Sequence, residues 1–137
     1  MLRGMILTLV VALMLGTAVT AQPKKKATLP VGTWVKGFGK DSVTFIIKKS
    51  TMRTELNIGD DSIALDSDIG FSSEDSVLFG RIIKSNDLSG NAPPPGALFS
   101  FACEMKDGNL IISDLQPNHP EARDIVEGTY KQKKGQK

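Results

Sequence analysis

Short stretches of alternating apolar and polar residues, separated by turn signals, recur along this chain from residue 33 to residue 132. In the clearest one, residues 52–58, Met52, Thr54 and Leu56 are separated by charged or amide side chains. A period of two places successive side chains on opposite faces of a β-strand, one toward a core and one toward water. Asp107 and Gly108 stand between two such stretches and are a strong signal for a two-residue hairpin. The pattern restricts the chain to an all-β sandwich or barrel.

The pattern predicts eight short strands, which are Thr33–Phe38, Val43–Lys48, Met52–Ile58, Ser62–Asp68, Val77–Ser85, Leu98–Lys106, Asn109–Leu115 and Thr129–Gln132. The fifth strand is apolar on both faces, so we expect it to be the most buried. Two loops stand out, Gly70–Asp75 and the proline-rich Asn86–Gly96. One short helix is predicted before the last strand, with Asn118 as its cap, Pro120 in its first turn and Gly128 at its end.

The first and last strands begin with similar triplets, Gly32-Thr33-Trp34 and Gly128-Thr129-Tyr130. Similar outer strands favour a closed antiparallel barrel in which these two strands pair, because closure removes the exposed edges of a sheet. A β-sandwich built from the same strands is the alternative.

The N-terminal residues predict a secretory signal peptide over residues 1–21. Arg3 precedes an apolar run from Met5 to Leu15, and the small residues that follow end at Ala21, after which we expect cleavage. The apolar run is shorter than the roughly 20 residues of a bilayer span, so no stable membrane insertion is expected after cleavage. We therefore expect an exported protein, periplasmic or extracellular. A disordered basic linker over residues 22–30, the β-domain over 31–131 and a disordered basic tail over 132–137 complete the predicted organisation.

Charge is distributed unevenly, although the formal net charge of the whole chain is only +2. Seven lysines lie in the two tails, while the body between them carries nine basic and fifteen acidic residues. An acidic body without a pattern of basic and aromatic surface residues argues against a nucleic-acid partner. The single cysteine, Cys103, excludes an intrachain disulfide and is predicted to be a buried thiol.

At Val31-Gly32-Thr33-Trp34 the chain resembles the lipocalin and calycin superfamily, in which Gly-x-Trp opens the first strand of an up-and-down barrel. It also resembles small lipocalin-like exported bacterial proteins of unknown function that run from a Gly-Thr-Trp start to a Gly-Thr-Tyr end. The resemblance implies an antiparallel up-and-down eight-stranded barrel over residues 31–131. The strands are shorter than those of a full lipocalin, which implies a smaller interior. The aromatic residues expected to fill much of it are Trp34, Phe45, Phe79, Phe99 and Phe101.

Arg81 and Trp34 are the candidate ligand-binding residues. Arg81 shares its parity with Phe79 and Ile83, and if that face points inward, a guanidinium inside the barrel needs a partner such as a ligand carboxylate. Alternatively, Leu78, Gly80 and Ile82 face the core, or Arg81 pairs with a local carboxylate. Trp34 is otherwise a core plug at the base of the barrel.

No catalytic residue, metal site or cofactor is predicted. The only histidine, His119, stands beside Pro120 at a helix start, where it is expected on the surface and away from Cys103. Asp66 and Asp68 resemble calcium ligands in type, but the spacing of the acidic residues after them does not fit an EF-hand.

We therefore expect a non-enzymatic, monomeric binding or interaction module that acts through its loops on a protein or another envelope component. The alternative is a carrier of a small apolar or acidic ligand inside the barrel. The interior separates the two, because a cavity of at least roughly 300 Å³ favours a carrier and a filled core favours the module.

Overall fold

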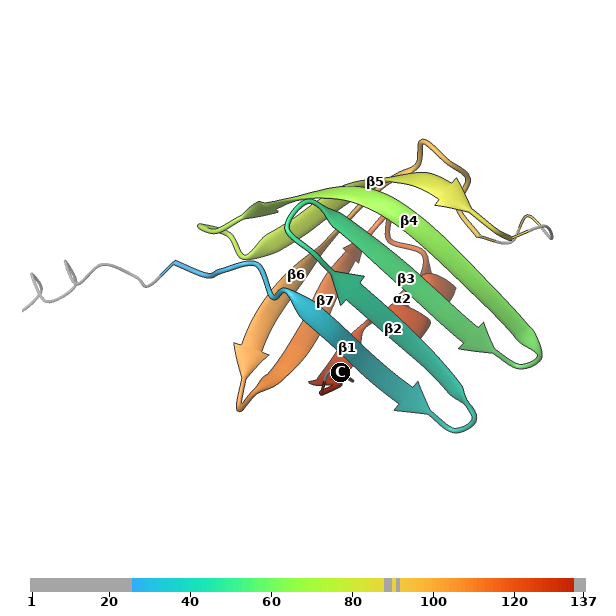
Figure 1. The fold of residues 1–137 in the computed structure, drawn as a ribbon, viewed down its shortest axis with the longest axis horizontal. Helices are drawn as coiled ribbons and strands as arrows, with labels where there is room; N and C mark the ends of the chain where they lie inside the picture. The colour runs from blue at the N-terminus through green and yellow to red at the C-terminus, as the bar shows by residue number, and fades with distance from the viewer. Residues whose placement is uncertain (1–25, 88–89, 91, 135–137) are drawn as a thin grey trace, which may run out of the picture.

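The computed structural model describes residues 26–87, 90 and 92–134 of the chain (Figure 1). The predicted signal peptide, its cleavage after Ala21 and the first part of the predicted linker lie outside the described residues. No helix within the described residues is long and apolar enough to cross a membrane.

Eight strands form a closed antiparallel barrel, in which each strand pairs with the next along the chain and β8 pairs with β1 (Figure 1). The elements are β1 (Gly32–Phe38), β2 (Asp41–Ile47), β3 (Thr51–Ile58), β4 (Asp61–Ser72), β5 (Val77–Ser85), β6 (Leu98–Lys106), β7 (Asn109–Gln116), α2 (Pro120–Val126) and β8 (Gly128–Gln132). The predicted all-β barrel with one short helix before its last strand is confirmed, and the sandwich alternative is wrong.

The seam between β1 and β8 closes the barrel through few strand pairs. Trp34 lies opposite Gln132 and Val35 opposite Lys131, and the Lys133 N–H donates to the Thr33 carbonyl at 2.8 Å. The predicted tail therefore begins later than expected, because Gln132 belongs to β8.

The two similar triplets begin the two strands of this seam in the same way. Gly32 and Gly128 have φ angles of +138° and +139°, which favour glycine. Two residues later, an aromatic side chain turns into the core and donates a hydrogen bond to the backbone carbonyl four residues upstream. The Trp34 Nε1 atom donates to Pro30 at 2.9 Å, and the Tyr130 hydroxyl donates to Val126 at 2.6 Å. Each aromatic residue thereby fixes the segment that enters its strand.

The core is built from the inward residues of all eight strands. Val43, Phe45 and Ile47 of β2 are buried as their spacing predicts, and Met52 and Thr54 of β3 follow the same rule. Within the described residues, no buried side-chain nitrogen or oxygen lacks a hydrogen-bond partner. The barrel interior is therefore a packed apolar core with its few polar groups satisfied.

β5 is not the most buried strand, contrary to the sequence-based prediction. Asp66 of β4 pairs with Lys84 and Ser67 pairs with Ile82, so Ile83 is an extra residue that forms a β-bulge. The bulge places Ile83 beside Lys84 on the outer face, where Ile83 is 47% exposed. An apolar sequence on both faces of a strand therefore does not mean burial on both faces here.

β4 is longer than predicted, because its last residues pair with the start of β5 where a loop beginning at Gly70 was expected. Gly70 lies opposite Phe79 on the outer face, and Gly80 lies opposite Phe99 on the inner face. In each pair, a phenylalanine ring lies over the glycine, where an added Cβ would be 2.6 Å from ring carbons. The aromatic ring covers the backbone that a glycine leaves open.

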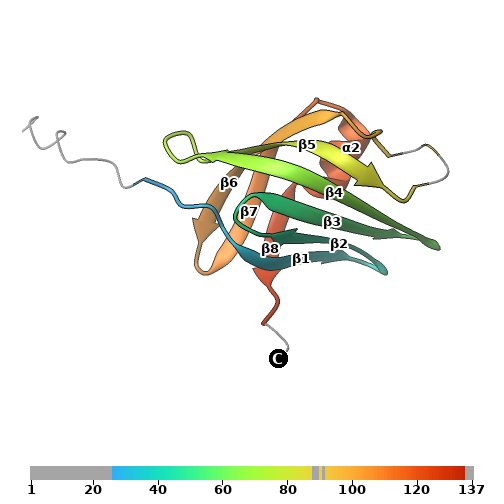
Figure 2. The ribbon, with the colours of Figure 1, turned by 45° about the horizontal axis from the view of Figure 1, so that its top comes forward.

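The barrel has two distinct ends. The terminal end, as we name it, carries the first and last residues that the structure describes and the β2–β3, β4–β5 and β6–β7 turns. The helix end carries α2 and the remaining connections (Figures 1 and 2). At the helix end, Ala122, Ile125 and Val126 of α2 pack against the core. The predicted cap of α2 is wrong by one residue: His119 is the cap residue, and the Asn118 side chain instead accepts a bond from Arg123 at 2.9 Å.

At the terminal end, residues 26–31 lie against the barrel. The Ala27 N–H donates to the Ser73 carbonyl at 3.2 Å, Leu29 packs against the core and Pro30 is buried. This part of the predicted disordered linker is therefore part of the folded domain.

Candidate functional site

The interior of the barrel is occupied by aromatic side chains. The Phe45 ring centroid lies 5.4 Å from that of Phe101 and 5.2 Å from that of Tyr130, and all three residues are at most 2% exposed. Leu78 and Leu110 are fully buried in the same core. These side chains form the centre of the apolar core inside the barrel.

Trp34 is a core residue, as the predicted plug at the barrel base requires. It is 3% exposed, and its only polar atom is already bonded to Pro30. Phe99 is partly buried near Phe101, whereas Phe79 is on the outer face, so the expectation that Phe79 fills the interior is wrong.

Arg81 lies on the outer face of the barrel, so an inward guanidinium at this position is excluded. Its side chain is 60% exposed, and its Nη2 atom lies 3.9 Å from the carboxylate of Asp68 on β4. Leu78 and Ile82 face the core, and Gly80 lies under Phe99, as the alternative interpretation stated. Arg81 and Trp34 are therefore on opposite sides of the barrel wall and form no common site.

Lys36 is a cation whose side chain points inward, and its role was not predicted from the sequence. Its ammonium donates to the Glu127 carbonyl at 2.7 Å and lies 5.0 Å from the centroid of the Phe38 ring and 5.9 Å from that of Tyr130. Burial lowers the pKa of Lys36, against the opposing influence of Asp124 and Glu127. The signal was available, since Lys36 shares its parity with the buried Trp34.

The Lys36 ammonium closes the β1–β8 seam where the two strands separate. Beyond the Val35–Lys131 pair no further pair joins β1 to β8, and a Cβ added at Gly128 would lie 3.0 Å from the Lys36 side chain. The side chain thus passes beside Gly128 to reach the carbonyl of Glu127. We assign Lys36 to the structure of the seam, because its ammonium bonds the Glu127 carbonyl and lies over the rings of Phe38 and Tyr130.

Glu127 joins α2 to a bulge in β7. Its carboxylate accepts from the Leu115 N–H at 2.9 Å and from Arg123 Nε at 2.9 Å. The bonds from Leu115 and Arg123 lower the pKa of Glu127. Asp114, just before Leu115, has a φ of +52°, and the extra residue of β7 lies here between the pairs at Ser113 and Gln116. These bonds attach the C-terminal end of α2 to β7, and we call them the Glu127 clamp.

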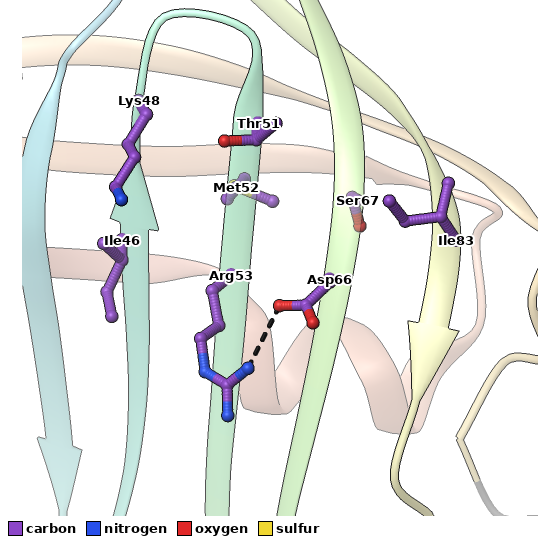
Figure 3. Close-up of a pocket in the computed structure, with 8 residues that line it drawn as sticks. All are labelled: Ile46, Lys48, Thr51, Met52, Arg53, Asp66, Ser67 and Ile83. Atoms are coloured by element: carbon purple, nitrogen blue, oxygen red, sulfur yellow. Dashed lines mark hydrogen bonds and ion pairs between the residues drawn. The ribbon is translucent and has the colours of Figure 1, made fainter.

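A hollow of about 420 Å³ lies on the outer face of β2–β5 (Figure 3). Ile46 of β2 and Lys48, which follows β2, line one side, Ile83 of β5 lines the other, and Arg53 and Asp66 lie between them. Met52 and Ser67, which are buried, and Thr51 complete the lining. Ile83 faces outward by alternation from the buried Ile82, and the bulge places Lys84 on the same outer face.

Arg53 is held in place within the hollow. Its Nε atom lies 3.0 Å from the carboxylate of Glu55. Its Nη1 atom lies 3.1 Å from the carboxylate of Asp66 (Figure 3). These bonds raise the pKa of Arg53 above its ordinary value. The hollow therefore presents two apolar side chains, an oriented guanidinium–carboxylate pair and the lysine ammonium of Lys48 on one outer surface. Apolar and charged groups on one surface are typical of sites that bind an amphipathic partner.

Cys103 and His119 lie in different environments. Cys103 is buried in the core, where burial raises its pKa to about 12, whereas His119 is exposed beside α2. The described residues hold no cluster of three or more histidine, cysteine or acidic side chains that suits a metal ion. Asp66 and Asp68 instead pair with Arg53 and Arg81.

Comparison with known proteins adds no assignment, since no protein-family model, no curated protein and no solved structure matches this chain. Any functional conclusion therefore depends on the geometry described above.

Proposed function

We propose that this chain is an exported, non-enzymatic interaction module that binds its partner on the outer surface of a filled barrel. The observation that carries the proposal is the contrast between the two faces of the sheet. The inner face holds Phe45, Phe101 and Tyr130 in mutual contact, while the outer face keeps Phe79 and Ile83 about half exposed, and Ile83 lines a hollow. Exposed apolar side chains rimmed by charged residues are typical of interaction surfaces.

Export and a lipocalin-like relationship are part of the same proposal. Export is supported by the apolar run Met5–Leu15 and the small residues that end at Ala21. The relationship is supported by the consecutive antiparallel pairing of eight strands around a closed barrel. It is also supported by Gly32 and Trp34, which open the first strand and place an indole at the barrel base.

The partner's chemistry follows from the lining of the hollow. Ile46 and Ile83 favour an apolar side chain, and the Lys48 ammonium favours an acidic group near one edge. Arg53, already paired with Asp66, adds guanidinium and carboxylate hydrogen-bonding positions between them. We therefore propose a short amphipathic segment of a protein as the occupant of the hollow.

Native mass spectrometry of the protein purified from its own host separates a module from a carrier. We expect the native and denatured spectra to give the same polypeptide mass. A small-molecule mass that is present under native conditions and lost on denaturation would establish a carrier and overturn the proposal.

Site-specific photo-crosslinking in the host tests the surface itself. A photo-reactive amino acid at Ile83 is expected to form a protein adduct, and the same group at Thr129, exposed on β8, serves as the matched control. A second substitution in the same chain, Ile46→Lys, alters the opposite side of the hollow. It is expected to abolish the adduct formed at position 83 without changing the melting temperature. Equal adducts from positions 83 and 129 would contradict a specific surface at the hollow.

A further inference from the structure

The topology gathers lysines from four separate segments at the terminal end of the barrel. Gly32 pairs with Ile47, just before the β2–β3 turn, and the Lys133 N–H donates to Thr33, so these segments are neighbours. The β6–β7 hairpin lies beside them, since Leu110 pairs with Tyr130. The exposed lysines of this end are Lys26, Lys48, Lys49, Lys106, Lys131, Lys133 and Lys134.

The opposite end of the barrel has the opposite charge. At the terminal end, the seven lysines stand against four carboxylates, those of Glu74, Asp75, Glu104 and Asp107. At the helix end, residues 36–41, 60–61, 87 and 114–127 carry eight carboxylates against three cations. The molecule therefore has a positive terminal end and a negative helix end, which orients it in front of an anionic surface.

Two exposed apolar side chains lie among these lysines. Val31 precedes β1 and is 55% exposed, and Met105 is near the end of β6 and is 50% exposed. Lysines attract anionic headgroups, while nearby apolar side chains enter the interfacial region of a bilayer. A surface with both properties fits a lipid bilayer better than a purely ionic polymer.

The chain also enters the domain at this end. Ala27 is bonded to Ser73 of the β4–β5 turn, and the sequence directly before it contains Lys24, Lys25 and, further upstream, the apolar run Met5–Leu15. The described chain therefore begins on the same side of the barrel as the lysines (Figures 1 and 2).

From these observations we propose that the terminal end of the barrel docks peripherally on an anionic lipid bilayer, with the helix end directed away from it. The lysines supply the attraction, and Val31 and Met105 contact the headgroup boundary. This surface goes beyond the proposed function, and it shares only Lys48 with the hollow. A partner bound at the hollow would then be held close to the membrane.

Vesicle co-sedimentation with the purified exported protein tests the proposal. Vesicles of phosphatidylcholine alone are compared with vesicles that contain about one-third phosphatidylglycerol, at low and at high salt. We expect binding to the anionic vesicles only, and loss of binding near 1 M salt, where the Debye length falls to about 3 Å.

Two charge-reversal variants locate the surface. Lys49→Glu with Lys106→Glu reverses two exposed lysines of the terminal end, and Lys40→Glu with Lys84→Glu makes the same change in net charge away from it. A lysine near an anionic surface contributes about fivefold to partitioning, so the first variant is expected to bind at least about 25-fold more weakly and the second to bind as the unaltered protein does. Because all forms share the same N-terminus, differences report the barrel end rather than the leader.

A third variant and a soluble competitor complete the test. Met105→Ser with Val31→Ser leaves the net charge unchanged and is expected to bind anionic vesicles more weakly than the unaltered protein does. This loss is expected if the two apolar side chains contact a bilayer, and it is not expected for an ionic polymer. Equal losses in the two charge-reversal variants, or equal binding to both vesicle types, would overturn the proposal. Binding to dextran sulfate but not to anionic vesicles would assign the surface to an anionic polysaccharide instead. All variants are first compared by thermal melting, and only those that melt with the unaltered protein are used.

Discussion

The chemistry of Cys103 is decided by its position in the barrel wall. Its thiol faces the core at 4% exposure, and burial raises its pKa to about 12. Because the thiolate is the reactive form, a thiol in this setting is inert while the barrel is folded. We predict that Ellman's reagent at pH 8 modifies almost no Cys103 in the native protein and one thiol per chain in guanidinium chloride. Rapid labelling of the native protein would contradict a sealed core.

The two glycines under phenylalanine rings allow a matched test of packing on the two faces. At Gly80, an added Cβ would lie 2.6 Å from the Phe99 ring and 2.8 Å from the Asp68 carbonyl, so the backbone itself must move. At Gly70, only the half-exposed Phe79 ring is in the way. We predict that Gly80→Ala lowers the free energy of unfolding by about 1–3 kcal/mol and Gly70→Ala by less than about 1 kcal/mol, measured by urea denaturation. Equal decreases in the free energy of unfolding would mean that the Gly80–Phe99 pair inside the barrel is packed no more tightly than the Gly70–Phe79 pair outside.

Residue direction was predictable where a strand is apolar on one face only. The alternation of β2 gave Val43, Phe45 and Ile47 correctly. The same alternation failed in β5, because both faces of this strand are apolar. Hydropathy alone therefore cannot decide whether the Arg81 side chain points into the barrel or toward solvent. The outcome is set by pairing instead: Gly80 faces Phe99 inside, and the bulge at Ile83 shifts the pattern beyond it.

At the level of elements, α2 is attached to the barrel by a carboxylate as well as by its apolar stripe. Folding lowers the pKa of Glu127, first through the Leu115 N–H and then through Arg123. A lowered carboxyl pKa means that its stabilising effect is present above the ordinary carboxyl range and is lost as pH falls through the folded-state pKa. Low pH should therefore loosen the clamp between α2 and β7.

We predict that Glu127→Gln lowers the melting temperature at pH 7 and that the difference from the unaltered protein narrows steadily toward pH 3. The control is Glu121→Gln, which removes an exposed carboxylate of the same helix. It should leave the pH dependence of melting unchanged. If Glu127→Gln and the unaltered protein lose stability in parallel on acidification, the clamp is not held by the carboxylate.

The number, order and type of the elements followed from the sequence, but their ends did not. β4 continues to Ser72 because its last residues find partners in β5, which no local pattern records. The bulges at Ile83 and Asp114 arise from pairing between strands in the same way. The first bulge places Lys84 on the same outer face as Ile83, and the second directly precedes the Leu115 N–H that donates to Glu127, so these details were less predictable than the fold.

For the whole molecule, the similar triplets at the two ends of the domain correctly indicated a closed barrel. Closure depends on β8, a strand of five residues close to the C-terminus. It places the fully buried Tyr130 against Phe45 and beside β1. β8 therefore packs Tyr130 into the core and also pairs with two other strands, β1 and β7.

Two truncations test closure. Ending the chain after Gly128 removes Tyr130 and leaves the edges of β1 and β7 without their partner, whereas ending it after Lys134 retains every described contact of β8. Loss of a buried aromatic residue alone costs about 3–5 kcal/mol, a large part of the roughly 5–15 kcal/mol by which a domain is stable. We therefore predict that the shorter chain is largely unfolded at 37 °C and that the longer one melts as the full chain does.

The single tryptophan, Trp34, lies in the seam opposite Gln132, so its fluorescence emission reports closure of the barrel directly. It should shift to longer wavelength in the Gly128 truncation only. Unchanged melting and unchanged Trp34 emission in that truncation would show that the barrel does not close through β8.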